Sequence, residues 1–133
     1  MMKSFQLKLR VLLPVLLCGI AGAALPKFQA TYDLDLLVNG PLTAGTVGNA
    51  IVLGSTPGAQ VHLYNGSGVG STTTAYGLLE VSDGVRLASR LAGVSGNATF
   101  RRHVPRSLAG LAVYLQAIDD NGLISPVHTE IIQ

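Results

Sequence analysis

The three histidines, His62, His103 and His128, are the residues of this chain best suited to acid–base or metal chemistry. Hydrolysis would need one of them beside a nucleophilic serine, with a third group orienting the imidazole ring. The sequence has no G-x-S-x-G turn, and no two histidines have the close spacing of a zinc motif. Each histidine falls in a separate polar–apolar segment, which predicts solvent-facing positions on strands. A three-histidine zinc site at one end of a sheet stays open.

Two acidic groups, Asp33 with Asp35 and Asp119-Asp120-Asn121, could supply oxygen ligands to calcium. Calcium takes about six to eight oxygens, usually from several carboxylates. The first pair lies on one face of an alternating segment, and the second group is typical of a hairpin turn. Neither forms a calcium loop by itself. We predict that folding needs no metal and no cofactor, and a calcium site between end loops stays open.

The segment 65–77 is polar and rich in glycine. It lacks the lysine and the following helix of a phosphate-binding loop, so we expect a long surface loop. Such a loop could be shortened without loss of the fold. Tyr64 and Tyr76 bracket it, and Tyr64, Asn65 and Tyr76 are the candidate interaction residues. Tyrosine supplies contact area at binding surfaces.

The densest basic segment is Arg101-Arg102-His103 with Arg106, and Arg86 and Arg90 precede it. Alternation along a strand sends neighbouring arginines to opposite faces, which argues against a flat anion-binding stripe. We expect these charges to solvate a strand and to discourage edge-to-edge pairing. Contact with an acidic polysaccharide or another surface polymer is the alternative.

The first 24 residues have the order of a secretory signal peptide: three cations and no acid, an apolar run over 11–20, and small residues at 21–24. We predict cleavage after Ala23 or Ala24, with retention as a membrane anchor left open. Cleavage would remove Cys18, the only cysteine. It would also remove three of nine Lys and Arg, leaving six against seven Asp and Glu. A chain so balanced lacks the basic excess of a nucleic-acid binder.

The rest of the chain favours β structure, since 16 glycines and six prolines interrupt short runs of Val, Ile, Thr and Leu. Residues 25–41 are expected to form an N-terminal strand and lead-in, and 42–133 a single domain. Val113, Leu115 and Ala117 should face the core, with Tyr114, Gln116 and Ile118 on the other side or at a rim. Strands are predicted at 32–36, 50–53, 59–64, 78–81, 85–88, 98–104, 111–118 and 126–132, with a short helical turn near 106–111.

Seven or eight short strands at regular spacing predict an all-β fold, an antiparallel two-sheet sandwich of immunoglobulin-like or fibronectin-III-like type. A closed barrel is the alternative.

The sequence contains, in this order, 42–45 (LTAG), 54–59 (GSTPGA), 96–100 (GNATF), 104–105 (VP), 108–117 (LAGLAVYLQA) and 121–125 (NGLIS). This order resembles that of uncharacterised immunoglobulin-like domains of secreted proteins from environmental bacteria. The resemblance spans about 42–127. It implies export and a β-sandwich, and it carries no catalytic residues. Those domains typically end larger exported proteins, whereas little precedes the domain in this sequence.

These features predict an exported, non-enzymatic structural or interaction module in the cell envelope, the periplasm or outside the cell. A carbohydrate- or surface-binding module that uses the 65–77 loop is the alternative. The expected partner is a surface polymer or an envelope protein. No nucleic acid is expected, and the membrane is involved only through the signal peptide before cleavage.

Overall fold

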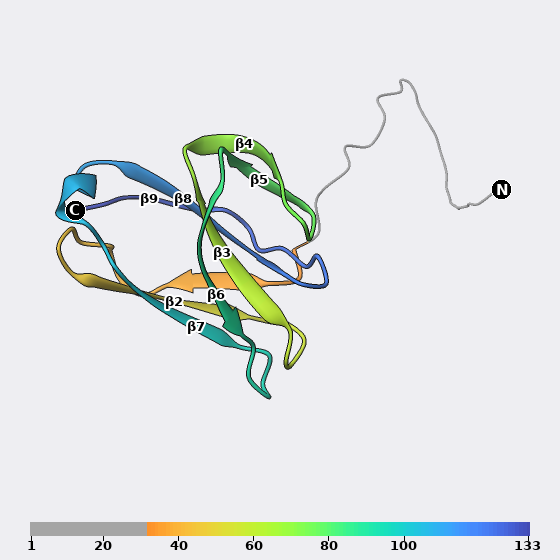
Figure 1. Ribbon diagram of the computed structural model, residues 1–133. Coiled ribbons are helices and arrows are strands. Elements are labelled where there is room, and N and C mark those ends of the chain that lie inside the picture. The colour runs from red at the N-terminus through yellow and green to blue at the C-terminus, as the bar shows by residue number, and fades with distance from the viewer. Residues whose placement is uncertain (1–31) are drawn as a thin grey trace, which may run out of the picture. The chain divides into compact units, whose positions relative to one another are not determined.

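Antiparallel strands and one short 3₁₀ helix build residues 32–133, the part of the chain that the computed structural model describes (Figure 1). The predicted signal peptide lies outside these residues, as does much of the predicted lead-in. No helix in the described part is long and apolar enough to cross a membrane. The elements are β1 (Asp35–Val38), β2 (Val47–Leu53), β3 (Gln60–Gly66), β4 (Gly68–Thr73), β5 (Leu78–Ser82), β6 (Val85–Leu91), β7 (Ala98–His103), η1 (Arg106–Leu108), β8 (Ala112–Asp119) and β9 (His128–Ile131).

Two sheets face each other in a sandwich-like arrangement. One has the strand order β1-β2-β7 and the other β6-β3-β8-β9, while β4 and β5 form a separate hairpin. Apolar side chains from both sheets fill the space between them. The predicted core positions of β8 are confirmed, because Val113, Leu115 and Ala117 belong to this cluster. The all-β prediction is confirmed, and the predicted helical turn is observed as η1.

The prediction of a long loop over 65–77 is wrong. β3 continues through Gly66, and β4 then pairs with β5. Gly66 and Gly70 allow close packing of the strands against β5. A Cβ atom added to Gly66 would lie 2.5 Å from the Val81 Cβ, closer than two carbon atoms can pack. Only the tip between Thr73 and Leu78 lies outside the two strands.

The β4–β5 hairpin packs on the side of β8 that faces away from the main core. Leu79 and Val81 of β5 form a second apolar cluster with Tyr64 and Ile118. Gln116 and Ile118 lie on the side predicted for them, yet both are fully buried. The hairpin therefore cannot be shortened without exposing this second cluster, contrary to the expectation from the sequence.

Hydrogen bonds fasten the hairpin at Gln116. Its side-chain carbonyl accepts a hydrogen bond from the Glu80 N–H at 2.7 Å, and its amide donates to the Ser125 carbonyl at 2.7 Å. The Tyr32 hydroxyl donates to the Glu80 carboxylate at 2.8 Å. That hydrogen bond, followed by desolvation and the carboxylate's charge, raises the pKa of Tyr32. A buried amide with both ends bonded avoids the cost of unpaired polar groups.

Two adjacent leucines of β5 test the role of the hairpin. Leu79 is fully buried, whereas Leu78 is 59% exposed. We expect Leu79→Ala to lower the free energy of unfolding by about 2–5 kcal/mol, because it leaves a cavity over β8. Leu78→Ala should change it by about 0.5 kcal/mol or less. Urea unfolding of both variants measures the difference, and equal midpoints would contradict a structural role for the hairpin.

Candidate functional site

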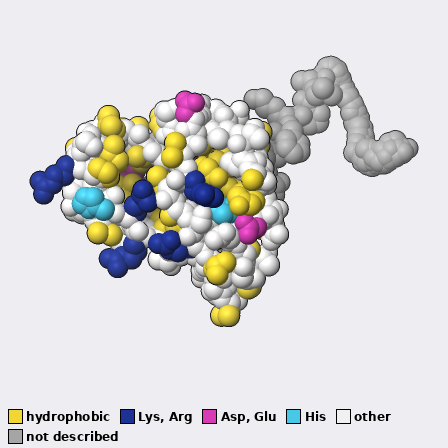
Figure 2. Space-filling model, viewed as in Figure 1, with side chains coloured by type: hydrophobic (Ala, Val, Ile, Leu, Met, Phe, Trp, Pro, Cys, Tyr) yellow, Lys and Arg dark blue, Asp and Glu magenta, His cyan; other side chains and the backbone are white. Residues whose placement is uncertain are grey.

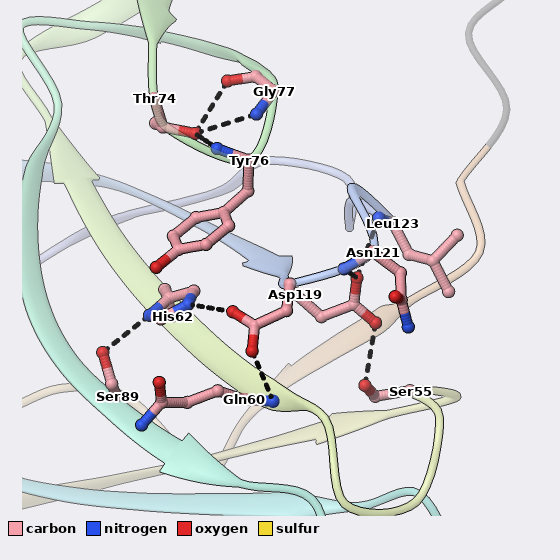
Figure 3. A network of polar contacts seen from close by, with 11 residues as sticks. Ser55, Gln60, His62, Thr74, Tyr76, Gly77, Ser89, Asp119, Asn121 and Leu123 are labelled. Carbon is pink, nitrogen blue, oxygen red and sulfur yellow. Dashed lines mark hydrogen bonds and ion pairs between the residues drawn. The ribbon is translucent and has the colours of Figure 1, made fainter.

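A buried polar cluster lies around His62 at the end of the molecule where β8 turns toward β9 (Figure 3). The Nδ1 atom of His62 is 2.7 Å from the Ser89 hydroxyl on β6, and Nε2 is 2.9 Å from an Asp120 carboxylate oxygen. His62 is only 1% exposed. The prediction that it faces solvent is therefore wrong, although its position on a strand was predicted correctly.

Tyr76 covers the imidazole ring. The two rings stack with centroids 4.4 Å apart and planes 9° from parallel. Tyr76 comes from the tip of the β4–β5 hairpin, where the Thr74 hydroxyl oxygen accepts hydrogen bonds from the N–H groups of Tyr76 and Gly77. The same hydroxyl donates to the Gly77 carbonyl at 2.7 Å. These local bonds hold the tip in the conformation that places the tyrosine over the histidine.

Asp119 organises the turn after β8. One carboxylate oxygen accepts hydrogen bonds from the N–H groups of Asn121 and Leu123, and the other accepts from the Ser55 hydroxyl at 2.9 Å. This carboxylate is fully buried and hydrogen-bonded at both oxygens. The acidic segment thus forms the predicted hairpin turn, and the Asp119 carboxylate stabilises that turn by accepting hydrogen bonds from its backbone.

The candidate metal ligands remain apart. His103 ends β7 in an exposed position, and His128 on β9 contacts Glu130 at 2.7 Å. Asp33 and Asp35 are exposed at the start of β1. Within residues 32–133, no three His, Cys, Asp or Glu side chains are placed to hold a metal ion together.

Ser89, His62 and Asp120 have the residue types of a hydrolase triad, but their arrangement favours a structural role. In serine hydrolases the acid contacts Nδ1 and the serine contacts Nε2, which is the reverse of the contacts here. Ser89 lies directly opposite His62 in the register of β3 and β6. Tyr76 covers the ring and leaves it almost without exposure. The cluster can fasten two strands, a turn and the hairpin tip through hydrogen bonds.

The three candidate interaction residues, Tyr64, Asn65 and Tyr76, have internal contacts. Tyr64 is 9% exposed and belongs to the second apolar cluster, against which Tyr76 packs. The Asn65 side-chain oxygen accepts a hydrogen bond from the Tyr114 N–H at 3.1 Å. Neither tyrosine offers a fully exposed ring as contact area.

Arginines define a second candidate site. All five arginines of the described residues are exposed, and all lie on β6, β7 or η1. Arg101 and Arg102 are successive residues of β7 and lie on opposite sides of the strand, as alternation predicts. We call the five together the arginine face. Figure 2 shows Lys and Arg side chains gathered on this side of the molecule, with apolar atoms between them. Within residues 32–133, no arginine forms an ion pair with an acid. The arginine face comprises Arg86, Arg90, Arg101, Arg102 and Arg106.

Searches of protein-family models, curated proteins and solved structures found no match to this chain. The functional interpretation therefore rests on the chemistry of the described residues.

The structural role of His62 predicts a stability defect in its alanine variant. We expect His62→Ala to lower the free energy of unfolding by about 2–4 kcal/mol, because it removes two hydrogen bonds and the packing against Tyr76. The exposed His103 provides the control, and His103→Ala should change stability by about 0.5 kcal/mol or less. Chemical denaturation measures both variants. A His62→Ala protein as stable as the parent would show that the cluster does not fasten the strands.

Proposed function

We propose that this chain is an exported, non-enzymatic interaction module that binds an acidic surface polymer through its arginine face. Export is proposed from the order of charged, apolar and small residues in 1–24. The observation that supports the binding function most directly is the clustering of exposed arginines without acidic partners in the described residues.

An immunoglobulin-like sandwich, closer to the fibronectin-III type, is the fold that we propose for this module. Leaving the β4–β5 hairpin aside, seven strands remain, in the orders β1-β2-β7 and β6-β3-β8-β9. In an immunoglobulin constant domain the fourth strand joins the first sheet. Here the corresponding strand, β6, pairs with β3 of the second sheet instead. The β4–β5 hairpin would then be an insertion between the third and fourth strands.

The charge distribution supports an anionic partner. The described residues hold seven Asp and Glu against five Arg, so their overall charge does not attract anions. The arginines nevertheless lie together on two neighbouring strands and the following turn. A cluster of one sign raises the local concentration of oppositely charged ligands, and the planar guanidinium group matches carboxylate and sulfate geometry. We therefore favour an acidic polysaccharide as the partner.

The arrangement of Ser89, His62 and Asp120 supports the proposal that the module is not an enzyme. His62 is bonded at both ring nitrogens and covered by Tyr76, so the ring is not open to a substrate. A general base must come within hydrogen-bond reach of the proton that it abstracts.

Export makes a prediction about the mature chain. The exported protein should begin at Ala24 or Leu25, contain no cysteine and carry no lipid. Intact-mass measurement of protein recovered outside the cytoplasm tests this. A mass that corresponds to a start at Met1, or to a lipid on Cys18, would contradict cleavage by a signal peptidase.

Polymer binding is tested with alginate, a carboxylated polysaccharide, against neutral dextran. We expect alginate binding that weakens as salt is added, because exposed charges are screened, and no dextran binding. The triple variant Arg86→Gln/Arg90→Gln/Arg101→Gln should bind alginate about tenfold more weakly, since each exposed contact contributes about 0.2–1 kcal/mol. Biolayer interferometry at low and physiological salt measures the affinities.

The control is Asp33→Asn/Asp35→Asn, which changes two exposed charges at the start of β1 and should not weaken binding. Equal binding by the parent and the triple variant would refute the arginine face as the contact surface. Absence of alginate binding at low salt would leave the arginines as protection for the edge strands β6 and β7.

A further inference from the structure

An apolar cavity of about 120 Å³ lies between the two sheets. Leu63, Val113 and Leu115 line it from the four-stranded sheet, and Ala50 and Phe100 line it from the three-stranded sheet. Protein interiors are normally packed without voids larger than a water molecule. The lining also includes the polar residues Asn49, Asn65, Arg102 and His103. The apolar part of such a cavity takes up small apolar molecules. The space is therefore suited to an apolar guest.

The sequence of β2 explains why space remains here. The residues of β2 that share the core side decrease in size along the strand, from Val52 through Ala50 to Gly48. Their partners on β7 are Ala98, Phe100 and Arg102. At the Gly48 end, the Leu42 side chain takes the place of a β2 side chain, because a Cβ atom added to Gly48 would lie 2.8 Å from the Leu42 Cδ2 atom. The remaining space lies beside the small side chain of Ala50.

Arg102 lies where this cavity reaches the surface. It follows Ala98 and Phe100 on the core side of β7, but its own side chain is exposed. Its Nη1 atom donates a hydrogen bond at 2.8 Å to the Leu87 carbonyl on β6, across the gap between the sheets. Within residues 32–133, its other guanidinium N–H groups have no acceptor and no acid is paired with it. An unneutralised cation therefore borders an apolar cavity.

We propose that this cavity binds a small free carboxylate with an apolar tail. The tail occupies the space between Leu63, Phe100 and Leu115, and the carboxylate pairs with the Arg102 guanidinium. A cavity of about 150 Å³ holds a benzene molecule, so this one accommodates a chain of about four to six carbons. Arginine binds carboxylates through two parallel hydrogen bonds, which fixes the orientation of the guest. The proposal does not depend on polymer binding by the other arginines.

The probe is hexanoate, titrated into the exported protein while the methyl NMR signals of Leu63, Val113 and Leu115 are recorded. We expect saturable shifts of these methyl signals. Hexanol has the same tail without the charge and should bind about tenfold more weakly, because it cannot accept charge-assisted hydrogen bonds from the Arg102 guanidinium as a carboxylate does. Acetate has the charge without the tail and should leave the methyl signals unchanged.

Two neighbouring arginines give a matched pair of variants. Arg102→Met keeps an apolar stem but removes the charge, and it should weaken hexanoate binding about tenfold while leaving hexanol binding unchanged. Arg101 precedes Arg102 on β7, so its side chain lies on the other side of the strand, and it is not among the residues that line the cavity. Arg101→Met should therefore bind hexanoate as the parent does. Both side chains are exposed, so neither substitution threatens the fold.

A filled cavity provides the second test. Ala50→Leu should abolish the methyl shifts caused by both hexanoate and hexanol, with circular dichroism showing whether the variant folds. Hexanoate that leaves the parent's methyl signals unchanged would overturn the proposal. So would Arg102→Met binding hexanoate as tightly as the parent, or an equal loss in Arg101→Met, which would indicate general charge attraction. The Arg86→Gln/Arg90→Gln/Arg101→Gln variant should keep hexanoate binding, which separates this site from the polymer surface.

Discussion

Burial of strand β8 on both faces is the constraint on which the rest of this structure depends. Val113, Leu115 and Ala117 face the three-stranded sheet, and Gln116 and Ile118 lie under the β4–β5 hairpin. The second face contains a polar amide, so the cover must supply hydrogen bonds as well as apolar area. The backbone of Glu80 meets this requirement directly. The hairpin is consequently part of the core rather than a surface appendage.

The two ends of the sandwich differ in how completely their buried side chains are packed and hydrogen-bonded. Near Asp119, buried polar side chains are bonded within the protein: Asp119 to a turn and to Ser55, and His62 to Ser89 and Asp120. At the opposite end of β8 and β3, the core side is incompletely filled and is bordered by arginine. One end is closed by internal bonds, and the other leaves both space and charge available. The proposed binding of anions relies on the second end, while the internal bonds of the first end hold the strands and the turn together.

Alternation and turn residues were sufficient to predict most strands, the helical turn at η1 and the core side of β8. They were not sufficient for β4. Close strand packing requires Gly66 and Gly70, and in a single sequence a segment rich in glycine has the composition of a loop. Alternation also placed His62 on the correct strand, but it cannot tell whether another element covers that side. One feature of the sequence does indicate such a cover. Ile118 is apolar and lies on the side of β8 opposite Val113 and Leu115, and apolar residues on both sides of a strand indicate that both sides are buried. The pairing of His62 with Asp120 required the fold.

Buried polar groups and exposed arginines differ in whether they need hydrogen-bond partners within the protein. A polar group taken out of water must be bonded inside the protein, and the residues around His62 satisfy that rule almost completely. Exposed arginines are under no such pressure, because water solvates them. Arg102 is the exception, since it shares the core side of β7 with Phe100 and reaches across the gap to a backbone carbonyl of β6. The bond to this carbonyl uses one of the five guanidinium N–H donors of Arg102 and leaves its positive charge without a partner among the described residues. Arg102 therefore lies between the incompletely filled core and the solvent. An anion with an apolar tail would place its tail in the cavity and pair its charge with the guanidinium group.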